Sequence, residues 1–135
     1  MDTIKHTVLF NIPAKTLFEA WLDSKEHGKM INGNAKINPI VDGKFSIWDD
    51  YATGVTLEID PKNYKIVQSW CDNSSDWPED HMSIITLQIK SIGEKSCELF
   101  FEHAGVPKKN QKDIEQGWKD YYWHPMANYF KAKKS

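Results

Sequence analysis

Apolar and polar residues alternate at the start of the chain, which is the pattern of a strand with one buried face. The side predicted to be buried consists of Ile4, His6, Val8, Phe10 and Ile12. After Pro13, which suits the first turn of a helix, apolar residues recur three or four positions apart. These residues are Leu17, Phe18, Trp21 and Leu22. We therefore expect a strand followed by a short amphipathic helix.

The helical pattern continues over residues 25–31 and ends at Asn32-Gly33-Asn34, because asparagine and glycine tolerate the left-handed conformation of helix ends. From there to residue 104, turn signals separate five or six strands of an antiparallel meander. The turn signals are Asp42-Gly43, Asp49-Asp50, residues 60–63, residues 72–80 and Gly93-Glu94. Three of the strands have a predicted apolar face: Val55, Leu57 and Ile59; Ile85, Leu87 and Ile89; and Cys97, Leu99, Phe101 and His103.

A long carboxy-terminal helix is expected to cover these faces. Asn110 is placed to cap this helix, and Asp113 stands where a capping-box acid would help. Pro125 is expected to bend the helix one turn earlier, because proline lacks a donor and crowds the carbonyl four residues back. The inward stripe is predicted to be Ile114, Gly117, Trp118, Tyr121, Tyr122, Met126, Tyr129 and Phe130. The pattern predicts an α+β fold, with a curved antiparallel sheet of about six to seven strands wrapped around the helix.

The composition adds one unusual feature, an aromatic share of 13% that includes six Trp. The chain has 135 residues, of which 40% are hydrophobic and 27% charged, so we expect one folded domain over residues 1–135. A formal net charge of −2 provides no global field that would attract nucleic acid or an anionic membrane. Neither is therefore expected as a partner.

The amino terminus lacks the cationic start and the long apolar middle of a secretory signal, and no stretch approaches the length of a membrane span. Cys71 and Cys97 have neither a CxxC spacing nor paired histidines nearby, so no metal site is expected. We expect both thiols to be reduced in a cytoplasmic protein that needs no cofactor.

Several short motifs, taken in order, are similar to those of a known family. They are Gly43-Lys44-Phe45, Ile66-Val67-Gln68-Ser69-Trp70, Trp77-Pro78-Glu79-Asp80-His81, Thr86-Leu87, Gly105-Val106-Pro107 and Gln116-Gly117-Trp118-Lys119-Asp120-Tyr121-Tyr122. From about Lys5 to Phe130 the chain resembles the activator-of-heat-shock-protein-90-ATPase homologue family, within the START-like, polyketide-cyclase-like superfamily. The resemblance implies a helix-grip fold with two short helices after the first strand. It also implies a scaffold shared by lipid carriers, hormone-binding proteins, aromatase/cyclase enzymes and chaperone co-factors.

A sheet that curls around a helix leaves a gap that is either hollow or packed, and both alternatives remain open. For a hollow gap, the predicted walls of an apolar ligand site are Trp21, Phe45, Trp70, Leu87, Phe101, His103, Trp118, Tyr121 and Tyr122. Taken one at a time, aromatic residues at helical spacing more often fill a core. Glycine inside a helix costs about 1 kcal/mol relative to alanine, so Gly117 indicates either ligand access or close approach of a strand.

His103 is the main candidate for acid–base chemistry, because strand alternation places it with Leu99 and Phe101 on the face toward the gap. The alternative is a structural histidine that only bonds a backbone carbonyl. No acid partner or nucleophile pattern accompanies His103, so no catalytic residue is predicted. Of the other histidines, His6 is expected in the core, and His27 and His124 at the surface.

Three functional hypotheses follow. The leading hypothesis is a non-enzymatic protein that binds an apolar or amphipathic small molecule between sheet and helix. The second is a chaperone-regulating interaction module, with Trp77 in the acidic loop 72–80 as a possible partner anchor. In the alternative for that loop, Trp77 folds back on the rim of the sheet. The third hypothesis is a cyclase-like enzyme that uses His103 as a general acid or base.

Overall fold

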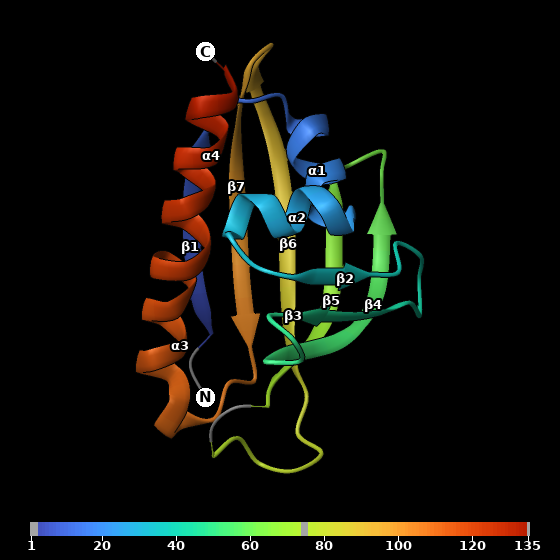
Figure 1. The fold of residues 1–135 in the computed structure, drawn as a ribbon, viewed down its shortest axis with the longest axis vertical. Helices are drawn as coiled ribbons and strands as arrows, with labels where there is room; N and C mark the ends of the chain where they lie inside the picture. The colour runs from blue at the N-terminus through green and yellow to red at the C-terminus, as the bar shows by residue number, and fades with distance from the viewer. Residues whose placement is uncertain (1–2, 74–75, 135) are drawn as a thin grey trace.

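A computed structural model of the protein describes residues 3–73 and 76–134, with residues 132–134 as backbone only. Ser74 and Ser75, in the predicted loop 72–80, lie outside the described residues. Within this part of the chain, seven strands form an antiparallel sheet in the order β1-β7-β6-β5-β4-β3-β2 (Figure 1). The strands are β1 (Ile4–Phe10), β2 (Ala35–Ile37), β3 (Lys44–Ile47), β4 (Ala52–Asp60), β5 (Lys65–Asp72), β6 (Ser83–Gly93) and β7 (Ser96–Ala104). The first strand therefore pairs with the last one, as residue pairs such as Ile4 with His103 show.

Two short helices follow β1 as the spacing predicts, α1 (Ala14–Leu22) and α2 (Ser24–Ile31). The Asp23 carboxylate accepts a 2.8 Å hydrogen bond from the backbone N–H of Glu26, which caps the start of α2. Asn32 ends α2 in the left-handed conformation, with φ of 57°. The chain then turns directly into the edge strand β2.

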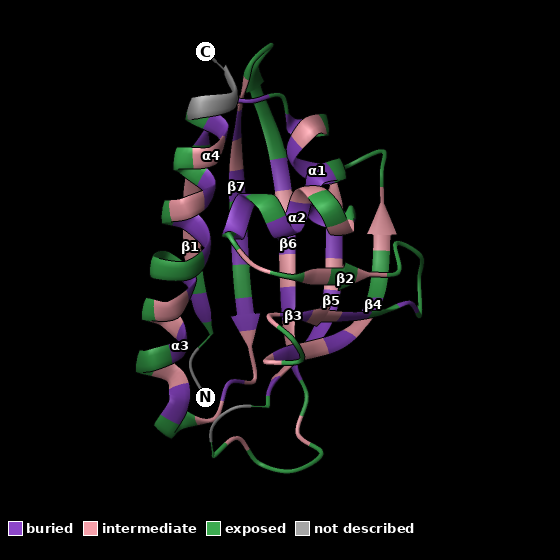
Figure 2. Ribbon diagram, viewed as in Figure 1, coloured by how far each residue is buried: buried purple, intermediate pink, exposed green. Residues whose placement is uncertain are grey.

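The core lies between the sheet and the helices, where the buried residues of the strands and of the long helix face one another (Figure 2). The predicted faces of β6 and β7 are confirmed, since each of their seven side chains is at most 2% exposed. The predicted face of β4 is wrong, because Leu57 is 44% exposed and Thr56 is fully buried. A bulge between Thr56 and Glu58 shifts the register there, so the alternation does not run through the strand.

The carboxy-terminal helix is continuous in Figure 1 but changes its winding in the middle. It consists of η1 (Lys108–Asn110), α3 (Gln111–Trp118), the π-helical turn η2 (Lys119–Trp123) and α4 (His124–Lys134). The N–H of His124 bonds the carbonyl of Lys119, five residues back, within the turn that precedes Pro125. The irregularity thus occurs where proline was expected to act, in the form of a π turn.

The π turn corrects the predicted inward stripe. A wider turn holds one extra residue, so Tyr122 and Trp123 both face the core, at 5% and 6% exposure. Tyr121, which was predicted to point inward, is 63% exposed. The buried apolar residues described in this helix are Ile114, Trp118, Tyr122, Trp123, Met126 and Phe130.

The predicted cap of the long helix is also wrong. Asn110 makes no side-chain cap for α3, because a 3₁₀ turn precedes that helix. The Asn110 side chain instead donates a 3.2 Å hydrogen bond to Asp76. This contact connects the 72–80 loop to the start of the helix.

Candidate functional site

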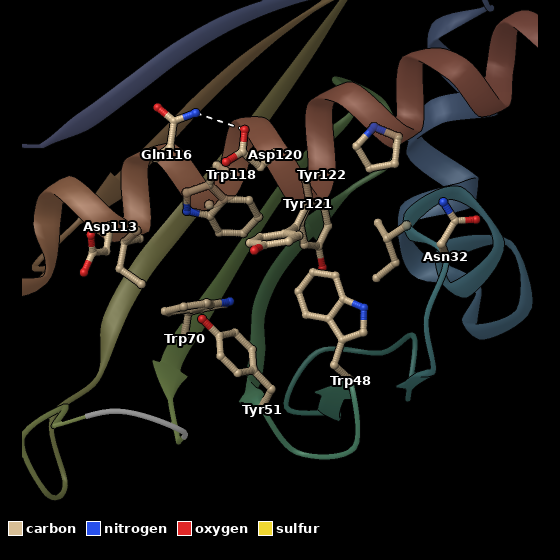
Figure 3. A pocket seen from close by; sticks show the side chains of 14 residues that line it. Asn32, Trp48, Tyr51, Trp70, Asp113, Gln116, Trp118, Asp120, Tyr121 and Tyr122 are labelled. Carbon is tan, nitrogen blue, oxygen red and sulfur yellow. Dashed lines mark hydrogen bonds between the residues drawn. The ribbon is translucent and has the colours of Figure 1, made fainter.

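An open groove of about 940 Å³ lies between the long helix and the β3–β4 turn (Figure 3). Six of its fourteen lining residues are aromatic, which gives it apolar walls of rigid rings. The lining residues are Ile31, Asn32, Trp48, Tyr51, Trp70, Asp113, Ile114, Gln116, Gly117, Trp118, Asp120, Tyr121, Tyr122 and Pro125. The volume lies within the range of about 300–1,000 Å³ that small-molecule sites occupy.

The β3–β4 turn supplies the wall opposite the helix. Trp48, Asp49 and Asp50 have consecutive positive φ angles of 51°, 54° and 72°. Each left-handed non-glycine residue costs about 1–2 kcal/mol, so other contacts must hold the turn in this shape. The N–H of Trp48 donates a 2.8 Å hydrogen bond to the carbonyl of Asn34. The Trp48 indole also occupies the space where a side chain at Gly33 would stand.

The helix side of the groove is formed by α3 and the π turn. Tyr121 stands at the mouth, with its ring 6.1 Å from that of Trp48 in an edge-on contact. A Cβ atom added at Gly117 would meet only the Tyr121 ring, at 3.8 Å, which is an ordinary contact. No strand therefore lies close enough to position 117 to require glycine there. The missing side chain instead leaves free space in the groove next to the Tyr121 ring.

The interior below the groove is packed. Its remaining void measures only about 10 Å³ and lies among side chains of α1, α2, the sheet and the long helix. The residues around it are Trp21, His27, Ile37, Phe45, Ile47, Gln68, Trp70, Ile85, Trp118 and Tyr122. A void of this size is at the limit for a single water molecule, so this space among the described side chains is too small for a ligand.

The predicted wall residues fall into three groups in the structure. Trp70, Trp118, Tyr121 and Tyr122 line the open groove. Trp21 and Phe45 border only the small void. Leu87, Phe101 and His103 line neither space and are at most 1% exposed.

Sequence reasoning missed Trp48 and Tyr51, which form the outer wall of the groove. A signal for them was present, because these two aromatic residues flank the Asp49-Asp50 turn. An aromatic residue on each side of a polar turn is exposed to solvent unless another element covers it. Here the long helix covers them only in part.

His103 is held in a closed chain of hydrogen bonds. The Trp118 indole donates to His103 Nδ1 at 3.0 Å, so Nε2 carries the proton and donates to Ser83 Oγ at 2.7 Å. Ser83 in turn donates to the carbonyl of Trp70 at 2.7 Å. Burial lowers the pKa of His103 to about 3, so the ring is neutral. Both ring nitrogens are thus occupied, by side chains rather than by a backbone carbonyl.

His27 was expected at the surface and is instead 2% exposed. Its Nδ1 donates to the carbonyl of Trp21 at 2.7 Å, so its Nε2 accepts a 2.8 Å bond from the Tyr122 hydroxyl. Burial lowers the pKa of His27 to about 4 and raises the pKa of Tyr122. The expectation failed because α2 packs against the long helix, which the local sequence does not reveal.

The structure also places His6 and Trp77, two residues whose positions were predicted from the sequence. His6 is half-buried, and its Nδ1 accepts a 2.8 Å hydrogen bond from the Trp123 indole. Trp77 folds back on the rim of the sheet, where its ring lies 5.6 Å from that of Trp70 and its indole donates to the carbonyl of His81. Trp77 is therefore half-buried and lies outside the groove.

The described ranges contain no group of three or more His, Cys, Asp or Glu side chains arranged to hold a metal ion. Among the helices described, none is both long and apolar enough to cross a lipid bilayer. Cys97 is buried, which raises the pKa of its thiol to about 11, and Cys71 is half-buried.

The sheet, the two short helices and the long covering helix define a helix-grip fold. Residues 11–131 match the family described as Activator of Hsp90 ATPase homolog 1-like protein, and the chain belongs to this family. The family resemblance and the helix-grip fold expected from the sequence are therefore confirmed.

A human protein of this family shows how similar the sequence is to a known relative. Activator of 90 kDa heat shock protein ATPase homolog 1 from Homo sapiens is 35% identical over 89 residues, which is 65% of this chain and 25% of the human protein. The chain thus spans about a quarter of that relative.

Two solved structures share the fold. PFC0360w, an HSP90 activator from Plasmodium falciparum, superposes with a TM-score of 0.81 at 26% identity, covering 90% of this chain and 91% of its own. The di-domain ARO/CYC BexL from the BE-7585A biosynthetic pathway superposes with a TM-score of 0.79 at 11% identity, covering 100% of this chain and 48% of its own. At that identity, the likeness to BexL concerns the fold alone.

Proposed function

We propose that this chain is a non-enzymatic binding protein that takes an apolar or amphipathic small molecule in the groove. The observation that carries the proposal is a groove of about 940 Å³ with six aromatic side chains in its lining. Aromatic rings offer large, rigid apolar surfaces, and burying them against a ligand is favourable. The proposed ligand site is the open groove, since the void described below it has only about 10 Å³ of free space.

The state of His103 supports a binding function over catalysis. A general acid or base must reach the reacting atom and change its protonation near the working pH. His103 is fully buried, has both nitrogens occupied and is neutral because its pKa is about 3. Its role in this proposal is structural, because it joins β7 to the helix through Trp118.

The test is binding of a neutral aromatic probe, 1-naphthylmethanol, measured by isothermal titration calorimetry. Gly117→Leu places a branched side chain on the wall of the groove and is expected to weaken binding by roughly tenfold or more, through lost contact area. Gly117→Ala is the matched control, because one methyl group at this position makes only an ordinary contact with Tyr121. Equal affinity of wild type and Gly117→Leu for 1-naphthylmethanol would contradict binding in the groove.

Endogenous ligand is sought separately by native mass spectrometry of the purified protein, followed by denaturation and identification of released molecules. A stoichiometric apolar or amphipathic passenger is the expected result. A protein that is empty and binds no lipid or aromatic metabolite in thermal-shift assays would contradict the carrier function.

A second candidate function is regulation of an Hsp90-type chaperone ATPase. Family membership and 35% identity to a human Hsp90 ATPase activator favour it. The proposed contact surface is the loop that carries Trp77, since that side chain is half-buried next to exposed Pro78 and Glu79. Stimulation of the ATPase of an Hsp90 from the same organism is the test. Trp77→Ala should reduce stimulation and Gly117→Leu should not, and the reverse pattern would contradict a role for this loop.

A further inference from the structure

We infer that the groove selects amphipathic ligands whose polar end is positively charged, a choice of ligand class that rests on the proposed function. The lining contains two carboxylates, Asp113 and Asp120, and two neutral amides, Asn32 and Gln116. Among these described lining residues there is no Lys, Arg or His. An anionic ligand would meet only like charges and neutral groups at this surface.

Asp113 and Asp120 lie on the face of the long helix that lines the groove. Asp113, Gly117 and Asp120 stand four and three residues apart, so they lie on neighbouring turns of one face. The Asp120 carboxylate is held by a 2.9 Å hydrogen bond from the Gln116 amide (Figure 3). Lys119, the neighbour of Asp120 in the sequence, is not among the residues that line the groove.

The turn between the opposite wall residues Trp48 and Tyr51 carries negative charge as well. Asp49 and Asp50 are exposed between the wall residues Trp48 and Tyr51. The Asn34 amide donates to Asp49 at 3.1 Å, and the Ser46 hydroxyl donates to Asp50 at 2.5 Å, so hydrogen bonds with neutral groups orient both carboxylates.

A fifth acidic residue, Asp72, contacts the outer wall through Tyr51. The Tyr51 hydroxyl donates to the carboxylate of Asp72 at 3.3 Å, and Asp72 is only 5% exposed. This bond orients the Tyr51 ring against the groove. It also places a carboxylate at the hydroxyl end of that ring.

The aromatic walls add a second attraction for cations. The faces of Trp and Tyr rings carry negative charge density, and a cation within about 6 Å of a ring centre gains about 0.5–1 kcal/mol even at exposed sites. Trp48 and Tyr121 contact each other edge-on and both line the groove, so a ligand bound beside them can contact both rings. The same surface therefore binds the apolar body of a ligand and favours a positive charge at its end.

The test compares three probes that share one ring system and differ in charge: 1-naphthylmethylammonium, 1-naphthylmethanol and 1-naphthoate. At low salt, the cation should bind roughly tenfold or more tightly than the anion, with the alcohol between them. The preference should shrink when salt is raised from about 20 mM to about 0.5 M, because exposed charges are screened. Calorimetry on the full chain measures each affinity.

The deciding variant is Asp113→Asn combined with Asp120→Asn, which keeps the shape of both side chains. It should reduce the ratio of cation to anion affinity to roughly threefold, the part that the rings and the remaining carboxylates near the opposite wall contribute. The matched control removes two charges elsewhere, through Glu19→Gln with Glu94→Gln, both at exposed positions outside the groove. The control should retain the wild-type ratio.

The outcomes separate this inference from the proposed function. Equal affinities of wild type for cation and anion, or a ratio that survives the double Asp variant, would overturn the charge preference. The proposed function would still stand in that case if Gly117→Leu weakened binding of the neutral alcohol. Failure of all three probes to bind wild type would overturn the proposed function, and the charge preference with it.

Discussion

The interior and the groove are built from the same kinds of side chain, yet one is closed and the other open. In the interior, the Trp118 indole donates a hydrogen bond to His103, and the void beside Trp118 measures only about 10 Å³. In the groove, rings of the same types border an open space of about 940 Å³. The difference arises from backbone geometry, because the π turn directs Tyr121 outward and the left-handed turn places Trp48 opposite to it. Aromatic content alone therefore does not locate a binding site in this fold.

The largest expected effect comes from opening the packed region. Phe101→Ala should destabilise the protein by about 3–5 kcal/mol, because the buried ring contacts Trp118 and Trp123 and its removal leaves a cavity. Phe100→Ala is the matched control on the other face of the same strand, where the ring is 39% exposed. Its cost should be under about 1 kcal/mol. Denaturant unfolding measures both, and equal losses would show that the interior is not tightly packed.

Low pH should reduce the free energy of unfolding through two histidines buried in the packed region. The pKa values of His103 and His27, about 3 and about 4, lie below the ordinary 6.5, so between these values the unfolded chain binds protons that the folded chain does not. Stability is therefore complete above pH 6.5 and falls as the pH is lowered. The two histidines together should remove about 2–3 kcal/mol between about pH 7.5 and about pH 5.5.

Urea unfolding at several pH values measures this loss. In His103→Gln only His27 remains of the pair, so the pH-dependent loss should be about half as large. Stability that does not change over this pH range would contradict the buried, neutral state of both rings.

A smaller change in stability is expected at Gly117, in the wall of the groove. Gly117→Ala should raise stability by about 0.5–1 kcal/mol, because alanine loses less backbone entropy in a helix and its methyl group has space. Thermal unfolding measures the gain. A loss of stability would mean that the backbone at this position is closely packed after all.

The smallest stability effect is expected at the mouth of the groove. Tyr121→Ala should change stability by less than about 0.5 kcal/mol, because the side chain is 63% exposed. The same substitution should weaken binding of 1-naphthylmethanol severalfold, through loss of an aromatic wall. Unchanged binding in a folded variant would separate Tyr121 from the site.

The fold was predictable from the sequence because most strands and both short helices keep one period along their length. Ile85, Leu87 and Ile89 alternate without interruption, and all three are buried as expected. The prediction failed at the β4 bulge, where Thr56 turns inward. It failed again at the π turn, which moves Tyr121 to the surface. Both features add one residue to a regular element, and a periodic pattern cannot reveal where that happens.

The groove was predictable only in part. Trp70, Trp118, Tyr121 and Tyr122 were among the expected wall residues and do line it. Trp48 was missed, because its place opposite the helix depends on a left-handed turn of Trp and Asp residues rather than of glycine. His27 was misplaced for a related reason, since its two partners are 6 and 95 residues away in the sequence. Long-range packing sets these positions.

The measurement that most directly tests the separation of groove and interior is a proton–nitrogen NMR titration with 1-naphthylmethanol, which follows the tryptophan indole N–H signals. We predict that the signals of Trp48 and Trp70, which line the groove, shift with ligand. The signals of Trp21 and Trp123 should stay in place, because their indoles are bonded to Gln68 and His6 in the packed interior. Large shifts of Trp21 and Trp123, with Trp48 unchanged, would place the ligand between sheet and helix and contradict the account.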